Sequence, residues 1–135
     1  MFLGTYEHNL LDKGRLSLPS KIRSVLEGQR IILRVAHEPC IVGFKESDWI
    51  ENTREELSKP FFLDKKGRDL RREIFASAEY AELDSQGRFV LPKVMLTHAA
   101  IKEKVIIIGA GDHFEIWDEK NWEEYQSDLT AYDPK

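Results

Sequence analysis

The pattern of hydrophobic and polar residues predicts short strands that alternate with short helices. Residues 1–11 predict an opening strand, and residues 16–18 alternate apolar and polar side chains at the period of a second strand. Pro19 suits the first turn of a helix, because its missing N–H has no helical partner there. Apolar residues then recur at helical spacing through residues 22–26, and Gly28 ends this helix.

The next part of the chain predicts a β-hairpin followed by two helices. Residues 31–35 and 40–44 are rich in apolar and β-branched residues and have the length of strands. Residues 47–58 have one apolar and one charged helix face, and Lys59-Pro60 ends that helix. Further apolar positions at helical spacing predict a second helix over residues 64–80.

The whole pattern occurs twice along the chain. The segment Leu11-Asp12-Lys13-Gly14-Arg15-Leu16-Ser17-Leu18-Pro19 returns 73 residues later as Asp84-Ser85-Gln86-Gly87-Arg88-Phe89-Val90-Leu91-Pro92. The same offset relates three further pairs without a gap: Ile32 and Val105, Phe44 and Trp117, and Trp49 and Trp122. Because two copies are too few for a solenoid, we expect a pseudo-symmetric pair of repeats around one core.

The second copy predicts the same order of elements as the first. A helix is expected over residues 94–100, strands over 105–109 and 114–117, and a last helix that carries Trp122 and Tyr125. The predicted fold class is α+β, with two tandem pseudo-symmetric repeats. The predicted division is a first repeat with its closing helix, a helical connector, a second repeat with its closing helix, and a tail: residues 1–58, 59–77, 78–130 and 131–135.

The composition is that of a folded, water-soluble protein. The 135 residues are 41% hydrophobic, which is enough to bury a core, and no run is long enough for a transmembrane helix. The amino terminus lacks the basic region and apolar stretch of a signal peptide, so a cytoplasmic protein is expected. Cys40 is the only cysteine, which excludes an intramolecular disulfide, and its apolar neighbours in the sequence favour a buried, inert thiol.

The distribution of charge is more informative than its sum. A net charge of −4 argues against a protein that coats nucleic acid indiscriminately, so DNA binding needs a local basic face. The repeated motif and the helix after it offer such a face in the residues Lys13, Arg15, Lys21, Arg23, Arg88 and Lys93. Arginine can grip phosphates or guanine with its planar fork, and a hairpin is narrow enough to enter the major groove. An arginine after a turn can equally pair with Asp12 or Asp84 and hold the hairpin, and the residues alone leave both interpretations open.

Motifs of enzymes and of metal sites are absent from the sequence. There is no Gly-x-x-x-x-Gly-Lys-Ser/Thr phosphate loop, no Gly-x-Ser-x-Gly nucleophile turn and no His-Glu-x-x-His pair. The four histidines share no metal-ligand spacing, and His98 is expected to be a structural histidine on a short helix. We therefore expect neither catalysis nor a bound metal or cofactor.

The repeated motif gives the chain a resemblance to a known family. Residues 12–19, their echo at 84–92 and the closing Glu115-Ile116-Trp117 resemble the MraZ family, relatives of the AbrB/MazE-type swapped-hairpin transcription factors. The resemblance covers essentially the whole chain. It implies two AbrB-like repeats that interlock into a swapped-hairpin β-barrel with peripheral helices.

The same resemblance implies a function. It is that of a bacterial, sequence-specific DNA-binding transcriptional regulator of the division and cell-wall gene cluster, associated with the nucleoid. Such proteins assemble into ring-like homo-oligomers that bind direct repeats of double-stranded DNA in promoters. The DNA-contacting arginine of the family corresponds to Arg15, with Lys13 beside it. Arg88 takes the same place in the second repeat, and Lys21 and Arg23 complete the predicted DNA-binding residues.

One position departs from the family pattern. The acid that leads the motif is Asp84 in the second copy, but Leu11 stands in its place in the first. The turn-capping bond available to Asp84 cannot form at Leu11, although Asp12 can cap instead. This difference, together with Lys13 in place of Gln86, predicts that the first turn reads DNA and the second is mainly structural.

A ring would explain how an acidic subunit binds DNA. One small basic edge gains little from counterion release, whereas linked copies on spaced DNA repeats bind tightly together. Phe2, Tyr6, Phe61 and Phe62 are candidates for the subunit contacts that a ring needs. The alternative function is a non-enzymatic, antitoxin-like interaction module of the same fold, which acidic charge and exposed aromatic residues would also suit.

Overall fold

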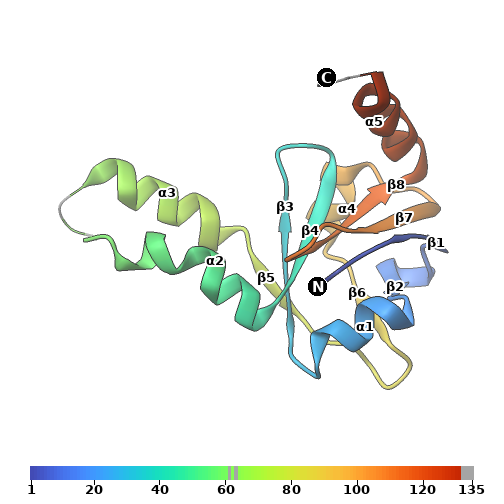
Figure 1. Cartoon of the computed structure of the whole chain (residues 1–135), viewed down its shortest axis with the longest axis horizontal. Helices are drawn as coiled ribbons and strands as arrows, with labels where there is room; N and C mark the ends of the chain where they lie inside the picture. Colours follow the sequence, from blue (N-terminus) through green and yellow to red (C-terminus); the bar gives the residue numbers. More distant parts are fainter. Residues whose placement is uncertain (61, 63, 132–135) are drawn as a thin grey trace.

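The computed structural model describes residues 1–60, 62 and 64–131, so the last four residues of the predicted tail lie outside it (Figure 1). The strands of the first half are β1 (Thr5–Asn9), β2 (Arg15–Ser17), β3 (Ile31–Val35) and β4 (Cys40–Lys45). Those of the second half are β5 (Glu79–Ala81), β6 (Arg88–Val90), β7 (Lys104–Gly109) and β8 (Phe114–Asp118). The helices are α1 (Ser20–Leu26), α2 (Glu46–Ser58), α3 (Lys65–Ala76), α4 (Lys93–Ala99) and α5 (Glu119–Ala131), with a 3-10 turn at Asp12–Gly14. The fold is mixed α+β, as predicted.

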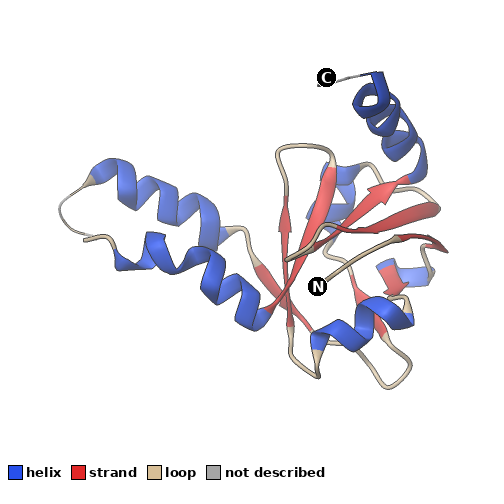
Figure 2. Cartoon of the chain, in the orientation of Figure 1, coloured by secondary structure: helices blue, strands red, loops and turns tan. Residues whose placement is uncertain are grey.

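The strands form one large antiparallel sheet and one small ribbon. The large sheet has six strands in the order β1-β7-β8-β4-β3-β5, and the ribbon pairs β2 with β6 (Figure 2). Each half of the chain lends strands to the other, because β1 pairs with β7 and β5 pairs with β3. Within the described residues β1 and β5 are separate edges of the large sheet, so the predicted swapped-hairpin barrel is not confirmed and no closed barrel is found.

The helices recur at the offset predicted from the sequence. The bounds of α1 and α4 differ by 73 residues, as do those of α2 and α5. Each short helix follows a proline, Pro19 or Pro92, and ends at a residue in the left-handed conformation, Glu27 (φ 52°) or Ala100 (φ 53°). The sequence repeat is therefore also a repeat of backbone conformation.

The main core lies between the large sheet, the ribbon and the two short helices. α1 contributes Ile22 and Leu26, which the helical spacing predicted, and α4 contributes Met95 and Ala99. Cys40 lies on the opposite face of the sheet and is buried, as predicted. Burial raises the pKa of its thiol, which keeps it protonated and unreactive.

β3 and β7 face the core one residue out of step with the predicted offset. Ile31 and Leu33 lie in the core on β3, whereas the matching core residues of β7 are Val105 and Ile107. The predicted equivalence of Ile32 with Val105 is therefore wrong for the side chains, because Ile32 lies outside this core. Strand residues alternate between two faces, so a shift of one residue exchanges the faces completely.

α3 is shorter than the predicted helix over residues 64–80. It begins after Asp64, whose carboxylate accepts a hydrogen bond from the N–H of Lys66 at 3.0 Å, and it ends at Ala76. The chain then forms β5, in which Ala81 pairs with Ile31 and is buried in the core. Pairing with β3 thus overrides a helical pattern that the local sequence would continue.

The candidate contact aromatics have different environments. Phe2 is fully buried, and its ring meets that of Phe114 edge-on with 5.4 Å between centroids. Phe2 is therefore a core residue, and the prediction that it makes subunit contacts is wrong. Tyr6 is half-buried, Phe62 is exposed, and Phe61 lies outside the described residues.

α2 and α3 form a helical hairpin that projects from one side of the sheet, away from α5 (Figure 1). Arg30 joins the base of this hairpin to the sheet. Its guanidinium pairs with Glu46 at 3.0 Å and lies 3.7 Å from the centroid of the Tyr80 ring. No helix among the described residues has both the length and the apolar character needed to cross a membrane.

Candidate nucleic-acid interface

The ribbon of β2 and β6 places two of the predicted arginines on one surface. Its register sets Arg15 opposite Val90, Leu16 opposite Phe89 and Ser17 opposite Arg88. Leu16 and Phe89 are buried in the core, so the alternation of strand side chains turns Arg15 and Arg88 outward on the same face. Diagonal neighbours of this kind lie about 7–8 Å apart. The two motif arginines therefore form one outward-facing pair.

In the second turn, Asp84 holds both the backbone and the arginine. One carboxylate oxygen accepts hydrogen bonds from the N–H groups of Gln86 (2.8 Å) and Arg88 (3.0 Å). The other accepts a hydrogen bond from Nε of Arg88 at 3.1 Å. These bonds, chiefly the one from the Arg88 N–H, lower the pKa of the Asp84 carboxyl. Arg88 is thus largely committed to holding its own turn.

In the first turn, Arg15 has no such carboxylate partner. Leu11 cannot accept a hydrogen bond, and the Nε of Arg15 donates instead to the backbone carbonyl of Asp12 at 3.3 Å. The predicted alternative cap by the Asp12 side chain is not found among the described contacts. Lys13 occupies the left-handed conformation (φ 62°) at the exposed tip. Throughout the described chain, neither Arg15 nor Lys13 makes an ion pair shorter than 4 Å.

Arg23 lies at the turn of the other repeat. Its guanidinium and Cδ cover Gly87, so closely that a Cβ at this position would clash with them. The matching place over Gly14 is taken by Leu96 of α4, whose Cδ1 would lie 3.3 Å from such a Cβ. Each turn is therefore covered by the helix of the other repeat, and Arg23 adds a positive charge to the second turn.

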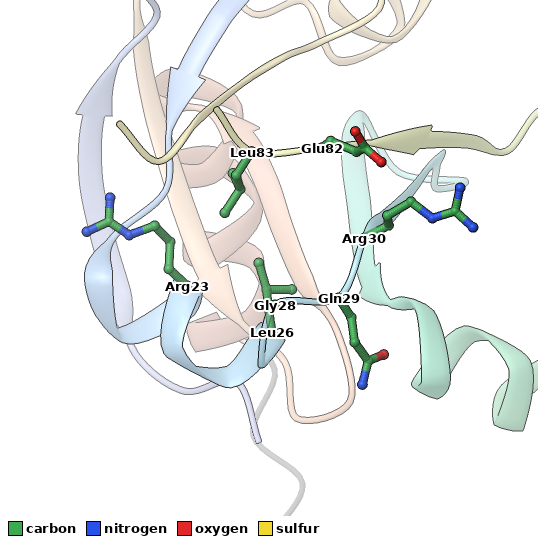
Figure 3. Close-up of a pocket in the computed structure, with 7 residues that line it drawn as sticks. All are labelled: Arg23, Leu26, Gly28, Gln29, Arg30, Glu82 and Leu83. Carbon is green, nitrogen blue, oxygen red and sulfur yellow. The ribbon is translucent and has the colours of Figure 1, made fainter. Parts of the chain in front are cut away.

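Figure 3 shows how Arg23 and Arg30 flank a cleft of about 370 Å³ next to α1. Leu26 and Leu83 lie between them, and Glu82 lies towards Arg30. The guanidinium of Arg23 points away from the middle of this cleft. We therefore assign Arg23 to the surface of the ribbon rather than to a ligand pocket.

The remaining basic residue of the predicted set, Lys21, lies exposed in the first turn of α1. His8 on β1 lies close to Arg23, and burial followed by the Arg23 charge lowers the pKa of His8. A neutral His8 leaves the positive charge of this surface to arginine and lysine at neutral pH. The surface thus offers permanent cations, which suit a phosphate backbone.

No group suited to metal binding occurs among the described residues, where no cluster of three histidine, cysteine, aspartate or glutamate side chains has that geometry. His98 makes a structural contact instead, with its Nε2 hydrogen-bonded to the carbonyl oxygen of Glu38 at 2.9 Å. The exposed cations of the ribbon therefore fit recognition of an anion.

The sequence located the basic residues of the ribbon, and the resemblance led us to expect repeats that interlock, but the place of Arg23 was not predicted. We grouped Arg23 with Arg15 because the two are close in sequence, whereas the structure sets Arg23 over Gly87. The apolar residues of the two motif strands could have indicated this position of Arg23. Each strand is too short to bury its own apolar face, so it must pack against the other repeat.

Comparison with known proteins identifies the family. A family model described as "MraZ protein, putative antitoxin-like" matches residues 1–72 and 74–133. The chain belongs to the MraZ family. A protein of Oenococcus oeni named transcriptional regulator MraZ is 39% identical over 125 residues, covering 93% of this chain and 86% of the relative. A protein of the same name from a Roseiflexus species is 37% identical over 131 residues, covering 97% of this chain and 90% of the relative.

A third relative of that name, from Finegoldia magna, is 36% identical over 128 residues, with 95% of this chain and 88% of the relative covered. These matches extend through both repeats and the α2/α3 hairpin. The resemblance expected from the two motifs is therefore confirmed for the MraZ chain as a whole.

Proposed function

We propose that this chain is a sequence-specific DNA-binding transcriptional regulator in which Arg15 and Lys13 read DNA. The observation that carries the proposal is the difference between the two turns. Asp84 holds Arg88 in place, whereas Arg15 bonds only to a backbone carbonyl and keeps its charge available. The relatives carry the name transcriptional regulator, which agrees with this function.

The proposed interface contains the five predicted basic residues in different roles. Arg15 and Lys13 lie at the first turn and contact bases or phosphates of the major groove. Arg23 and Arg88 lie at the second turn and neutralise phosphate there, while Lys21 on α1 reaches the flanking backbone. Each phosphate contact adds roughly 0.9 to the slope of log affinity against log salt.

The proposed targets are direct repeats in promoters, those of the bacterial division and cell-wall gene cluster, bound in the cytoplasm on the nucleoid. Several subunits in a ring would engage neighbouring repeats together, which offsets the weak binding of one subunit with a net charge of −4. In this proposal the repeats, residues 1–58 and 78–130, interlock through swapped hairpins, and the connector at 59–77 stands outside them.

The test is a salt titration of binding to promoter DNA that contains direct repeats, with the wild type, Arg15→Ala and a control. Arg54→Ala is the matched control, because Arg54 lies on α2 and pairs only locally with Glu51. Arg15→Ala is expected to weaken binding by about 10-fold or more and to lower the salt slope by about one. Undiminished affinity in Arg15→Ala would refute the role of Arg15.

The second candidate function is an antitoxin-like interaction module. The α2/α3 hairpin favours it, because Ile50, Leu57 and Leu70 are 51%, 46% and 41% exposed on its surface. Exposed apolar side chains on a projecting element suit a protein partner. Failure of the wild type to bind repeat DNA at low salt would support this function over the first.

A further inference from the structure

A cleft on the outer face of the sheet has no role in the proposed DNA interface. It lies between β3, β4 and α2 and has a volume of about 340 Å³. Side chains that line it include Val42, Phe44, Trp49, Asn52, Ile74 and His113. This volume is within the range of sites that hold small organic molecules.

The same place in the second repeat is filled by a tyrosine. At the offset of 73 residues, Trp117 replaces Phe44, Trp122 replaces Trp49 and Tyr125 replaces Asn52. The Tyr125 ring lies 4.9 Å from the Trp117 centroid and 6.4 Å from that of Trp122, nearly parallel to it at 28°. These aromatic residues pack with Cys40, which is the counterpart of His113 at the same offset.

The two aromatic walls have the same geometry in both repeats. The centroids of Phe44 and Trp49 are 5.4 Å apart at 67°, and those of Trp117 and Trp122 are 5.4 Å apart at 59°. In the first repeat Phe75 of α3 adds an edge-on contact with Trp49 at 5.9 Å, yet the cleft remains. The ring of His113 also lies 5.3 Å from that of Phe44. The first repeat thus keeps the aromatic pair but has Asn52 where the second repeat has the ring of Tyr125.

The charges around the cleft are mainly negative. Glu38 lines it directly, and His113 is held between the carboxylates of Asp112 (2.8 Å) and Glu115 (2.9 Å). Arg34 and His37 are the other basic residues of the lining, and Arg34 lies 3.9 Å from the carboxylate of Glu73. Glu38 in the lining and the three carboxylates beside it outnumber Arg34, His37 and His113, even if both histidines are counted as cations. A cationic ligand is therefore favoured over an anionic one.

We propose that this cleft binds a small aromatic amine, with its ring seated as Tyr125 is seated in the second repeat and its ammonium group near Glu38. Stacking between the aromatic walls provides the contact area, and the carboxylates select the charge. This site is separate from the ribbon, and the proposal does not depend on DNA binding.

The test uses tyramine as the probe, because it joins a tyrosine-like ring to an ammonium group. Calorimetric titration of the wild type is expected to give one site with a dissociation constant on the order of 1 mM or lower. The anion 4-hydroxyphenylacetate, which has the same ring, is expected to bind several-fold more weakly. Absence of saturable tyramine binding, or equal binding of the anion, would overturn the proposal.

Two variants locate the site. Asn52→Tyr introduces the ring of the second repeat into the cleft and is expected to abolish tyramine binding and to raise Tm. Ile50→Tyr adds the same side chain to the exposed face of α2, so it should bind tyramine as the wild type does. If a folded Asn52→Tyr binds as tightly as the wild type, the assignment is wrong.

A measurement on the wild type avoids dependence on a variant that fails to fold. Nuclear Overhauser contacts are expected between the ring protons of tyramine and those of Phe44 and Trp49. Contacts to Trp122 or Tyr125 instead would place the ligand on α5 and contradict the proposal.

Discussion

Two residues, Asp84 and Leu11, decide what the two motif arginines can do. The Asp84 carboxylate accepts three hydrogen bonds, and two of them come from Arg88. Leu11 offers no acceptor in its side chain, so the charge of Arg15 stays available to a ligand. One difference between otherwise similar repeats therefore gives Arg88 a carboxylate partner and leaves Arg15 with only a backbone carbonyl.

His113 allows a test of electrostatics at single-residue scale. Its hydrogen bond to Glu115, with help from Asp112, raises the pKa of His113, so the folded state holds the proton more tightly than the unfolded state does. This stabilisation is full below the ordinary histidine pKa of 6.5 and is lost as pH rises through the raised value. Burial lowers the pKa of His8, which has the opposite effect on stability, so the comparison must be between proteins that both keep His8.

We therefore expect His113→Gln to lower Tm clearly near pH 5.5 and much less near pH 9. Thermal unfolding followed by circular dichroism at both pH values measures this difference. An equal loss of Tm at the two pH values would show that the side chain acts through packing and that its charge contributes nothing.

At the scale of the elements, two glycines show where the fold is tight and where it is tolerant. Gly43 of β4 pairs with Phe114 of β8, and the Phe114 ring occupies the space in which a Cβ would stand. Gly67 lies in α3, where a Cβ would make only ordinary contacts of 3.5 Å or more with Asp64. Gly43 leaves space for the Phe114 ring, whereas no side chain needs the space beside Gly67.

Gly43→Ala is accordingly expected to lower the free energy of unfolding by about 1–3 kcal/mol, because Phe114 must move within a packed core. Gly67→Ala is the control and should raise it by about 0.5–1 kcal/mol, since alanine favours helix. Urea unfolding gives both values. A neutral Gly43→Ala would show that Phe114 is not fixed in the core.

The elements were predictable where local pattern and tertiary contact agree. The 73-residue offset located α2 and α5 because the apolar positions of a helix recur at a spacing that its own residues specify. The offset also relates β1 to β5, but the helical spacing over residues 64–80 failed at β5, where pairing with β3 decides the conformation. The offset failed for the facing of β3, which depends on one residue of register. The basic residues of the ribbon were located from the sequence because they belong to a local motif. The position of Arg23 over Gly87 could not be, because it depends on packing of the first repeat against the second.

At the scale of the whole molecule, strand pairing between the two repeats joins them into one structure. The β2/β6 ribbon has a different turn at each end. β2 and β6 pair across the pseudo-symmetry, so the two turns lie on one surface while their charges differ. A chain with a net charge of −4 thus carries a small basic edge on this ribbon, apart from the aromatic cleft on the outer face of the sheet.

The central claim is that the first turn reads DNA and the second holds the fold. The most direct measurement compares Arg15→Ala with Arg88→Ala for both the salt dependence of DNA binding and Tm. We predict that Arg15→Ala lowers the salt slope by about one and keeps Tm. Arg88→Ala should change the slope less and lower Tm, because Asp84 loses the bond from the Arg88 guanidinium. If both variants lowered the salt slope equally and neither changed Tm, this division between the turns would be contradicted.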